Sequence, residues 1–363
     1  MVTLKPQVKR PDTLLLAVVL GLTFFGILMV YDASSVIAFK DFGDKFFYAR
    51  QQTIWVAVGL ICLFFASRFN YHRFKPMAAP MMFLTIFFLV LVLFPGIGIK
   101  ILGARRWLIF GEFTFQPAEL AKLTVVIYLS SLFLQKPRLL PFIFTLTLLS
   151  FLIMKEPDLG TTVILASSGF LTYFASGASL FSVLGISAAG LLSGFILIFS
   201  SAYRKTRLLT FLDPSKDPLG TSYHIRQVLI ALGSGGLFGV GLGASRQKYS
   251  YLPEAMTDSI FAVIAEELGF VGCLLLIGVF LFIIWRGIKV AREAPDRFGQ
   301  LLGAGIACWI GIQTVVNLSA MVVLIPLTGV PLPFVSYGGS SLVVALTGVG
   351  ILLNISKQRV ARK

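Results

Sequence analysis

About ten apolar runs, each close to the 20 residues that a bilayer requires of a spanning helix, recur along the chain. Such repetition restricts the fold to an all-α integral membrane protein, because a helix satisfies its own backbone polar groups within hydrocarbon. A hydrophobic content of 57% agrees with this class. The predicted spans are 13–38, 51–68, 77–97, 117–135, 139–155, 160–177, 179–201, 259–285, 300–326 and 335–355.

We expect one transmembrane domain over residues 1–363, with a long outer segment, 202–258, between the seventh and eighth spans. Within that segment, apolar residues at helical spacing predict an amphipathic helix on the membrane interface. They are Ile225, Val228, Leu229 and Leu232, with Thr221 or Ser222 as the N-cap and Gly233 as the stop. The glycine-rich stretch 233–243 is predicted to bend closely against the bundle.

The basic residues of the short loops predict the orientation of the spans. An even number of spans places both tails on one side, and the loops of that side carry sixteen Lys and Arg against seven on the other. The positive-inside rule then makes the tails cytoplasmic in a multi-pass protein of the cytoplasmic membrane. The net charge of +15 is explained by these loops, and no nucleic-acid partner is expected.

Asp258 lies at the mouth of the eighth span, directly after Thr257. Both residue types favour helix N-caps, so we expect a half-buried acid that faces outward. Glu266 and Glu267 follow about 12 to 14 Å deeper along the same helix. Acids in a span are costly and are expected to face the protein interior with partners. The alternative is that Asp258 only caps its helix and that the two glutamates only pair with basic residues.

A second outward group of charges spans residues 103–123. Gln116, followed by a proline and by Glu119, is typical of a helix start. Glu119 and Lys122 stand three residues apart on one helix face, so a cap with an ion pair accounts for both. That explanation leaves Arg105 and Arg106 unaccounted for.

The fifth and sixth spans are joined by the short sequence KEPDLGTT, residues 155–162. Three charges in four residues indicate a tight polar turn. Either Lys155 pairs with Glu156 or Asp158, or these side chains project into an outward cavity. The last outward turn, 325–341, contains Ser336 and Ser340 among prolines and glycines, and irregular backbone at this depth is tolerated where it lines a cavity.

The outward charges restrict the chemistry. Cations suit a phosphate or diphosphate, and acids suit a general base or a divalent metal. Because ATP is absent outside the cell, a bond-forming enzyme there needs an activated substrate, and a lipid-linked diphosphate sugar meets that need. A flippase that moves the same lipid would require similar cations.

The three cysteines lie in apolar runs and indicate neither disulfides nor a metal site.

Seven motifs follow one another along the chain, namely GARRW at 103–107, QPAELAKL at 116–123, EPDLGTT at 156–162, DPLGTSYHIRQ at 217–227, GSGGLFGVGLG at 233–243, YLPEAMTDSIFAVIAEELGF at 251–270 and PLPFVSYGGSS at 331–341. Together they resemble the SEDS family, the RodA/FtsW group named for shape, elongation, division and sporulation. The sequence RQK followed by YLPE is more similar to the FtsW division branch of that family.

The resemblance implies a ten-span peptidoglycan glycosyltransferase that polymerises lipid II at the outer face of the membrane. Transfer would be inverting, with undecaprenyl diphosphate leaving, alongside a class B penicillin-binding protein transpeptidase. The family's essential acid falls on Asp258, and its basic positions fall on Arg50, Arg106 and Lys122. The usual His before TD and the aromatic after it are replaced by Met256 and Ser259, so that His is not required for proton transfer here.

Our hypothesis is that Asp258 accepts the proton of a sugar C4 hydroxyl, directly or through a divalent cation such as Mg²⁺ or Mn²⁺. A helix N-terminus tends to lower the pKa of an Asp, which opposes this role. The diphosphate would be bound by Arg50, Arg105, Arg106, Lys122, Arg246 and Lys248. Supporting positions would be Gln116, Glu119, Glu156, Asp158, Thr257, Ser336 and Ser340. The alternatives are a lipid II flippase and a non-catalytic scaffold for the transpeptidase.

Overall fold

The computed structural model describes residues 10–101, 104–111, 113–213, 220, 222–249 and 251–358. Gly103, Thr221 and the outermost basic residues of both tails lie outside the described residues. The helices are α1 (Thr13–Phe42), α2 (Phe47–Arg68), the short 3-10 helix η1 (Tyr71–Arg73), α3 (Phe74–Leu91), α4 (Pro117–Leu132), α5 (Leu139–Lys155), α6 (Leu159–Ala175), α7 (Leu180–Phe199), α8 (Ala202–Leu212), α9 (Tyr223–Gly235), α10 (Ile260–Arg292), α11 (Arg297–Met321) and α12 (Gly339–Lys357).

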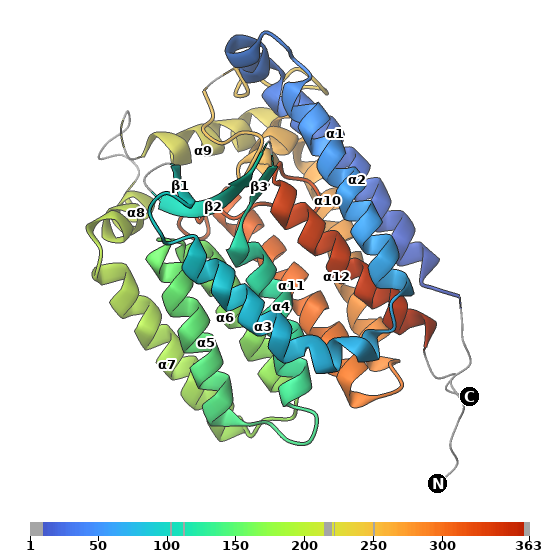
Figure 1. Ribbon diagram of the computed structural model, residues 1–363. Helices are drawn as coiled ribbons and strands as arrows, with labels where there is room; N and C mark the ends of the chain where they lie inside the picture. Colours follow the sequence, from blue (N-terminus) through green and yellow to red (C-terminus); the bar gives the residue numbers. More distant parts are fainter. Residues whose placement is uncertain are drawn as a thin grey trace.

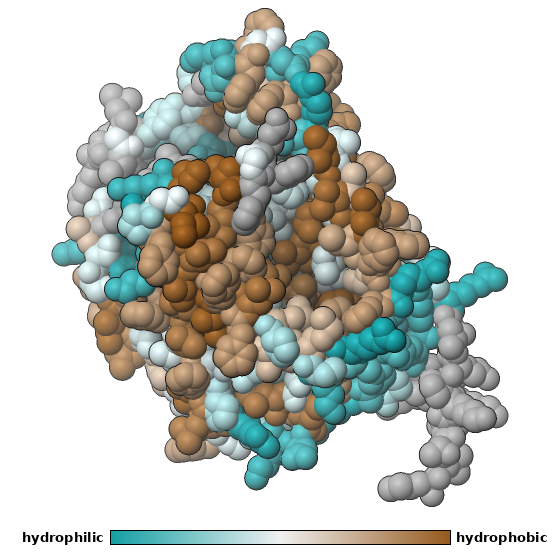
Figure 2. Space-filling model, in the orientation of Figure 1, coloured by the Kyte–Doolittle hydropathy of each residue, from teal (hydrophilic) through white to brown (hydrophobic). Residues whose placement is uncertain are grey.

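Each predicted span overlaps one helix of the bundle, with ends that differ by up to seven residues, which confirms the mostly helical membrane fold (Figure 1). Seven of the described helices are long and apolar enough to cross a bilayer, counting η1 with α3. The helices α5 and α6 have 17 residues each and α4 has 16, so they reach only about 25 Å at 1.5 Å per residue. Ten crossings therefore remain a prediction. In Figure 2, apolar side chains cover the middle of the face shown, with hydrophilic ones at its ends.

The beginning of α1 and the end of α12 lie side by side. The backbone N–H of Asp12 donates to Ser356 Oγ at 2.9 Å, and Arg286 Nε near the end of α10 donates to Asp12 Oδ2 at 2.7 Å. The segments expected to face outward, namely the β-strands, α9 and the turn before α10, gather at the opposite end of the bundle (Figure 1). The start of α1 and the end of α12 therefore lie at the same end of the bundle, which agrees with an even number of spans.

The all-α expectation missed a small sheet. Three antiparallel strands, β1 (Gly98–Ile101), β2 (Ala104–Phe110) and β3 (Phe113–Phe115), pair in the order β1-β2-β3. Lys100 pairs with Arg105, and Leu108 pairs with Phe115. Branched and aromatic residues favour strands, but runs this short carry little periodicity for sequence analysis to detect. The sheet fixes the two arginines of the GARRW motif on β2.

The helix α10 is broken, although the sequence reads as one continuous apolar run. Gly269 has φ 66° and ψ −167°, and the glycine-rich segment after α9 fills the break. The N–H of Val240 donates to the Glu266 carbonyl at 3.0 Å, and the N–H of Phe270 donates to the Gly236 carbonyl at 2.9 Å. A methyl group on Gly239 would lie 2.0 Å from the Glu267 carbonyl oxygen. The predicted close approach of the glycines is thus confirmed.

The outer segment holds two helices rather than one. The predicted amphipathic helix is α9, which buries Ile225, Val228 and Ala231 and continues past Gly233 to Gly235. Leu229 is 45% exposed, so the buried face is centred one position away from the prediction. The helix α8 was not predicted. Its polar composition, including three basic residues, gives no apolar run for sequence analysis to follow.

Candidate functional site

Asp258 lies on a turn before α10 rather than at its cap. The N-cap of α10 is Ser259, without a side-chain capping hydrogen bond, which corrects the predicted capping role. The Glu254 carbonyl accepts the backbone N–H groups of Thr257 and Ser259, both at 3.1 Å. Glu254 itself has φ 52°, an uncommon conformation for a residue with a side chain. The turn therefore places two acids, Glu254 and Asp258, on the same side of the helix start.

The carboxyl group of Asp258 is buried, with 8% of the residue exposed. The Thr257 hydroxyl lies 3.3 Å from Asp258 Oδ1 and 2.8 Å from Glu254 Oε2. Burial, together with the charge of Glu254, raises the pKa of Asp258 to about 7, while its own N–H, Thr257 and Arg207 oppose the rise. The expectation of a lowered pKa is therefore wrong, because desolvation outweighs the helix terminus. A carboxyl group with this pKa is suited to act as a general base at neutral pH.

The last outward turn is the backbone on which the site is assembled. Gly329 faces Asp258, such that a methyl group on Gly329 would lie 3.9 Å from Asp258 Oδ2. Asn317 Nδ2 donates to the carbonyls of Asp258 at 2.9 Å and Val330 at 2.7 Å. The N–H of Tyr337 donates to the Met256 carbonyl at 2.8 Å. The predicted irregular backbone is thus packed directly against the turn that carries Asp258.

Two residues of the outer helices reach this site, and the sequence analysis did not select either of them. Arg207 of α8 donates from Nη1 to the Leu327 carbonyl at 3.0 Å. His224 of α9 lies with Nε2 2.7 Å from Ser259 Oγ. Burial and the charge of Arg207 lower the pKa of His224 to about 4, so its ring is neutral at physiological pH. His224 lies within the DPLGTSYHIRQ motif, which was the available signal.

Arg106 holds the turn between α5 and α6. Its Nε donates to the Glu156 carbonyl at 2.9 Å, its Nη2 to the Pro157 carbonyl at 2.5 Å, and its Nη1 lies 3.9 Å from Asp158 Oδ2. Asp158 caps α6 by accepting the N–H of Thr161 at 2.9 Å. This turn packs against the last turn, since a methyl group on Gly160 would lie 2.7 Å from the Thr328 carbonyl oxygen. Arg106 therefore holds a turn that packs against the last outward turn, and its role in binding a diphosphate stays a prediction.

Neither alternative for Lys155 holds as stated. Its Nζ lies over the Phe151 ring, 5.3 Å from the centroid, and the side chain is exposed. Glu156 is buried instead, and burial followed by the charge of Asp158 raises its pKa to about 9. Glu156 is therefore protonated at neutral pH and is a poor partner for a cation.

The supporting polar residues tie the sheet to the last turn. Ser340 Oγ accepts the N–H of Gln116 at 3.1 Å and donates to the Thr114 carbonyl at 3.2 Å. Gln116 Nε2 lies 3.5 Å from Asp158 Oδ2. Ser336 Oγ accepts the N–H of Leu332 at 2.8 Å within the last turn. These contacts position backbone around the site.

Lys122 is completely buried beneath the last turn. Its Nζ lies 2.6 Å from Glu119 Oε2, which confirms the predicted intrahelical pair, and donates to Gln313 Oε1 at 2.8 Å. Gln313 Nε2 in turn donates to the Pro331 carbonyl at 3.0 Å. Lys122 therefore supports the turn from below rather than facing an outward cavity.

Lys248 belongs to a different cluster, between α1 and α10. Its Nζ donates to Asp32 Oδ1 at 2.7 Å and to Glu267 Oε1 at 3.1 Å. Glu266 accepts the Ser245 hydroxyl at 2.5 Å and the N–H of Arg246 at 3.1 Å. Both glutamates have partners, as predicted. Glu266 and Glu267 thus hold the loop before Lys248 against α10. The side chain of Arg246, in this loop, is exposed.

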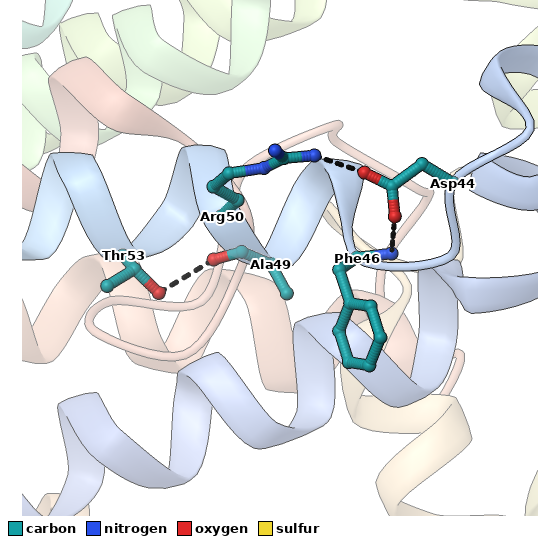
Figure 3. A pocket seen from close by; sticks show the side chains of 5 residues that line it. All are labelled: Asp44, Phe46, Ala49, Arg50 and Thr53. Carbon is teal, nitrogen blue, oxygen red and sulfur yellow. Dashed lines mark hydrogen bonds and ion pairs between the residues drawn. The ribbon is translucent and has the colours of Figure 1, made fainter.

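Arg50 lies at the start of α2 in an open depression lined by Asp44, Phe46, Ala49, Arg50 and Thr53 (Figure 3). Its guanidinium points to the carboxylate of Asp44, with which it forms an ion pair that is largely exposed. Arg105 occupies β2 opposite Lys100 and is partly buried. Within the described residues, the side chains of these two arginines form no hydrogen bond or ion pair with the turn that carries Asp258 or with the last outward turn.

The metal-binding potential of the site is limited. Within the described ranges, no group of three or more His, Cys, Asp and Glu side chains is placed to hold a metal ion. The three cysteines are free, as expected. Glu254 and Asp258, which flank one hydroxyl group, supply two carboxylates. Two carboxylates fit the way Mg²⁺ binds when substrate phosphates complete its shell.

Fold and site together define a polytopic membrane protein with a buried acid of near-neutral pKa among polar turns at one end of the bundle. The chain belongs to the FtsW/RodA/SpoVE family, whose model, described as "Cell cycle protein", matches residues 12–361. The resemblance to the SEDS family is thereby confirmed.

Two relatives support an FtsW-like branch. Stage V sporulation protein E of Bacillus subtilis is 41% identical over 96% of this chain and 97% of its own length. The probable peptidoglycan glycosyltransferase FtsW of Trichlorobacter lovleyi is 42% identical over 95% of this chain and 93% of its own length.

Solved structures show the same fold. A chain from a structure described as "Structural coordination of polymerization and crosslinking by a peptidoglycan synthase complex" superposes with a TM-score of 0.79 at 28% identity, over 95% of this chain and 97% of that one. The rod shape determining protein RodA of Thermus thermophilus superposes with a TM-score of 0.71 at 26% identity, over 97% and 98%.

Proposed function

We propose that this chain polymerises lipid II into glycan strands at the outer face of the cytoplasmic membrane, with Asp258 as the general base. The observation that carries the proposal is the buried carboxyl of Asp258, whose pKa of about 7 is matched to proton transfer at neutral pH. The chain's relatives named peptidoglycan glycosyltransferase support the reaction class. The excess of basic residues in the loops on the side of the tails supports an outward-facing site.

The reaction needs one proton acceptor and one stabilised leaving group. Asp258 takes the proton from the C4 hydroxyl of the acceptor sugar as that oxygen bonds to the anomeric carbon of the donor. The bond from that carbon to the diphosphate breaks, and the lipid diphosphate leaves with the electron pair. Attack opposite the leaving group inverts the anomeric carbon. The Thr257 hydroxyl, which lies 3.3 Å from Asp258 Oδ1, orients the carboxylate.

A divalent cation would be held by Glu254 and Asp258. Bound there beside the diphosphate, Mg²⁺ or Mn²⁺ would neutralise charge on the leaving group. Arg106 and Asp158 would keep the polar turn against the last turn, while Gln116 and Ser340 would anchor the sheet above it.

Two other functions use the same features. A lipid II flippase would also need cations on the outer side, and a scaffold would need only a surface for a class B penicillin-binding protein. A catalytic role is favoured by the raised pKa of Asp258, because neither transport nor recruitment requires a base in this range. The synthase complex that shares the fold supports a transpeptidase as partner.

The test is polymerisation of lipid II by the purified protein, alone and with its transpeptidase partner. We expect glycan polymer from the unchanged protein and a loss of at least about a hundredfold in Asp258→Asn, since a general base contributes roughly that much. Asp41→Asn, which removes an exposed acid near the same end, should polymerise normally. Polymer from Asp258→Asn at the normal rate would refute the assigned base. Accelerated lipid flip in vesicles without polymer would favour the flippase.

A further inference from the structure

The turn that joins α2 to α3 carries a group of positive charges at the end of the bundle where α1 begins and α12 ends. Arg68 is the last residue of α2, and Arg73 and Lys75 follow it around η1, all three with exposed side chains. Lys357, the last residue of α12, donates from Nζ to the Ser67 carbonyl at 2.8 Å, so its charge lies beside Arg68. We call this group of four cations the basic turn.

The basic turn has an excess of positive charge. Within the part of the chain that the structure describes, none of its four cations forms an ion pair with a carboxylate. Asp296, which contacts the same turn, is occupied, because it accepts the Tyr71 hydroxyl, lies 2.9 Å from His72 Nε2 and caps α11. By contrast, Arg286 at the same end of the bundle pairs with Asp12 at 2.7 Å. Positive charge without a neutralising partner attracts an anion.

Aromatic rings hold the two arginines at the edge of the apolar surface. The Arg68 guanidinium lies over the Phe64 ring, 4.9 Å from its centroid. The Arg73 guanidinium lies over the Phe69 ring in the same way, at 5.4 Å. Phe64 is 50% exposed and Phe65 is 65% exposed, so the end of α2 presents an apolar face beside the cations. In a bilayer, this arrangement puts the guanidinium groups at the level of the lipid headgroups, next to hydrocarbon.

The basic turn therefore lies where charged surface meets apolar surface. Figure 1 shows the end of α2 beside the end of α12, at the end of the bundle opposite the β-strands and α9. In Figure 2 this part of the molecule carries hydrophilic side chains, which border the apolar middle of the face. Cations next to exposed rings match the two parts of an anionic phospholipid, its headgroup and its acyl chains. A soluble anion would use the cations but not the rings.

We propose that the basic turn binds the headgroup of an anionic phospholipid, with an acyl chain of that lipid along the apolar face of α2. Arg68 and Arg73 bind the phosphate oxygens, for which their planar guanidinium groups are suited, and Lys75 and Lys357 add positive charge. By the predicted orientation, the lipid belongs to the cytoplasmic leaflet. The proposal does not depend on the proposed function, because it concerns the opposite end of the bundle from Asp258.

The test measures which lipid contacts this turn in mixed bilayers. Phe65→Trp places a fluorescent reporter on the apolar face of α2. Its quenching by brominated phosphatidylglycerol, which is anionic, is compared with its quenching by brominated phosphatidylcholine, which has no net charge. Leu140→Trp, exposed at the start of α5, is the reference reporter for nonspecific attraction at the same end of the bundle. The protein without an added tryptophan supplies the background signal, and thermal unfolding checks the folding of each variant.

At the Phe65→Trp reporter, phosphatidylglycerol should bind at least about fivefold more tightly than phosphatidylcholine, because several cations act on one headgroup. Arg68→Gln combined with Arg73→Gln should reduce this preference to less than about twofold. Arg138→Gln removes another exposed charge at the same end and should leave the preference unchanged. A preference of the same size at Leu140→Trp, or one that survives the loss of both arginines, would overturn the proposal.

A second measurement keeps the arginines in place. Sodium chloride screens exposed charges, so the preference at the Phe65→Trp reporter should fall as salt is added. Inorganic phosphate at the same ionic strength should lower it no further. A preference that salt does not change would contradict the proposal, and a further loss with phosphate would identify a soluble anion as the ligand instead. Because the reporter needs no turnover, failure to polymerise lipid II with this lipid preference intact would refute only the proposed function.

Discussion

The carboxylates of Glu254 and Asp258 lie on either side of one hydroxyl group, that of Thr257, at 2.8 and 3.3 Å. The arrangement arises because Glu254 adopts a positive φ and its carbonyl binds the two backbone N–H groups that follow. Two acids this close cannot both be ionised cheaply. Asp258 is buried, and its burial, followed by the charge of Glu254, raises the pKa of Asp258 to about 7.

The pH dependence of polymerisation should follow this pair. With a pKa of about 7 at Asp258, the rate at pH 6 should be about a tenth of its plateau and should level off above pH 8. Burial is the main cause of this raised pKa, and Glu254→Gln removes the second cause, the charge of Glu254, so the acidic limb should move to lower pH and the relative rate at pH 6 should rise about two- to fivefold. Lipid II polymerisation from pH 5 to 9 measures both profiles. An unmoved or upward-shifted limb in Glu254→Gln would contradict the pairing.

Asp258→Asn should stabilise the folded protein at alkaline pH. The folded-state pKa is raised from 3.8 to about 7, so the unfolded chain gives up this proton more readily. The stabilisation associated with the neutral carboxyl is complete below the unfolded value and is lost as pH rises through the folded value. Above pH 8 the ionised group costs at most about 4 kcal/mol, which Asn avoids. Thermal midpoints should differ at pH 8 and converge at pH 4. A lower midpoint for Asp258→Asn at pH 8 would contradict this.

The buried pair of Glu119 and Lys122 should respond as a unit. Lys122→Met leaves an uncompensated buried carboxylate and should destabilise the protein by about 3 to 5 kcal/mol. Adding Glu119→Gln should restore most of that stability, measured by thermal unfolding. Polymerisation should stay at least about tenfold reduced in the double variant, because Lys122 no longer holds Gln313 beneath the last turn. A double variant as unstable as Lys122→Met would show that the pair is not coupled.

The break in α10 should tolerate no side chain at Gly239. Its φ of 81° is strained for other residues, and a methyl group would meet the Glu267 carbonyl at 2.0 Å. Gly239→Ala should therefore cost at least about 2 kcal/mol in thermal unfolding. Gly233→Ala is the control, since no atom lies within 4 Å of a methyl group there and alanine favours the helix. Similar midpoints for the two variants would argue against the glycine segment as the element that fills the break.

Sequence alone determined the class of fold, because the length and apolarity of a spanning helix are properties of a local run. The helix start at Gln116, the pair of Glu119 with Lys122 and the close packing of the glycines were predicted for the same reason: each depends on neighbours along the chain or on backbone conformation. Asp258 was chosen as the candidate catalytic acid because of the motif that contains it. In the structure it lies on a turn that faces the last outward turn, which agrees with that choice.

Only the tertiary structure decided which charges meet. Lys122 and Lys248 read as cations facing outward, but Lys122 is buried between Glu119 of its own helix and Gln313 of α11, and Lys248 is buried with Asp32 of α1 and Glu267 of α10. Arg207 and His224 reach the site from helices whose approach no local pattern encodes. The pKa of Asp258 followed burial rather than the helix terminus, because desolvation depends on atoms brought from distant segments. Local preference fixes where helices form, whereas the electrostatics of the site is a property of their packing.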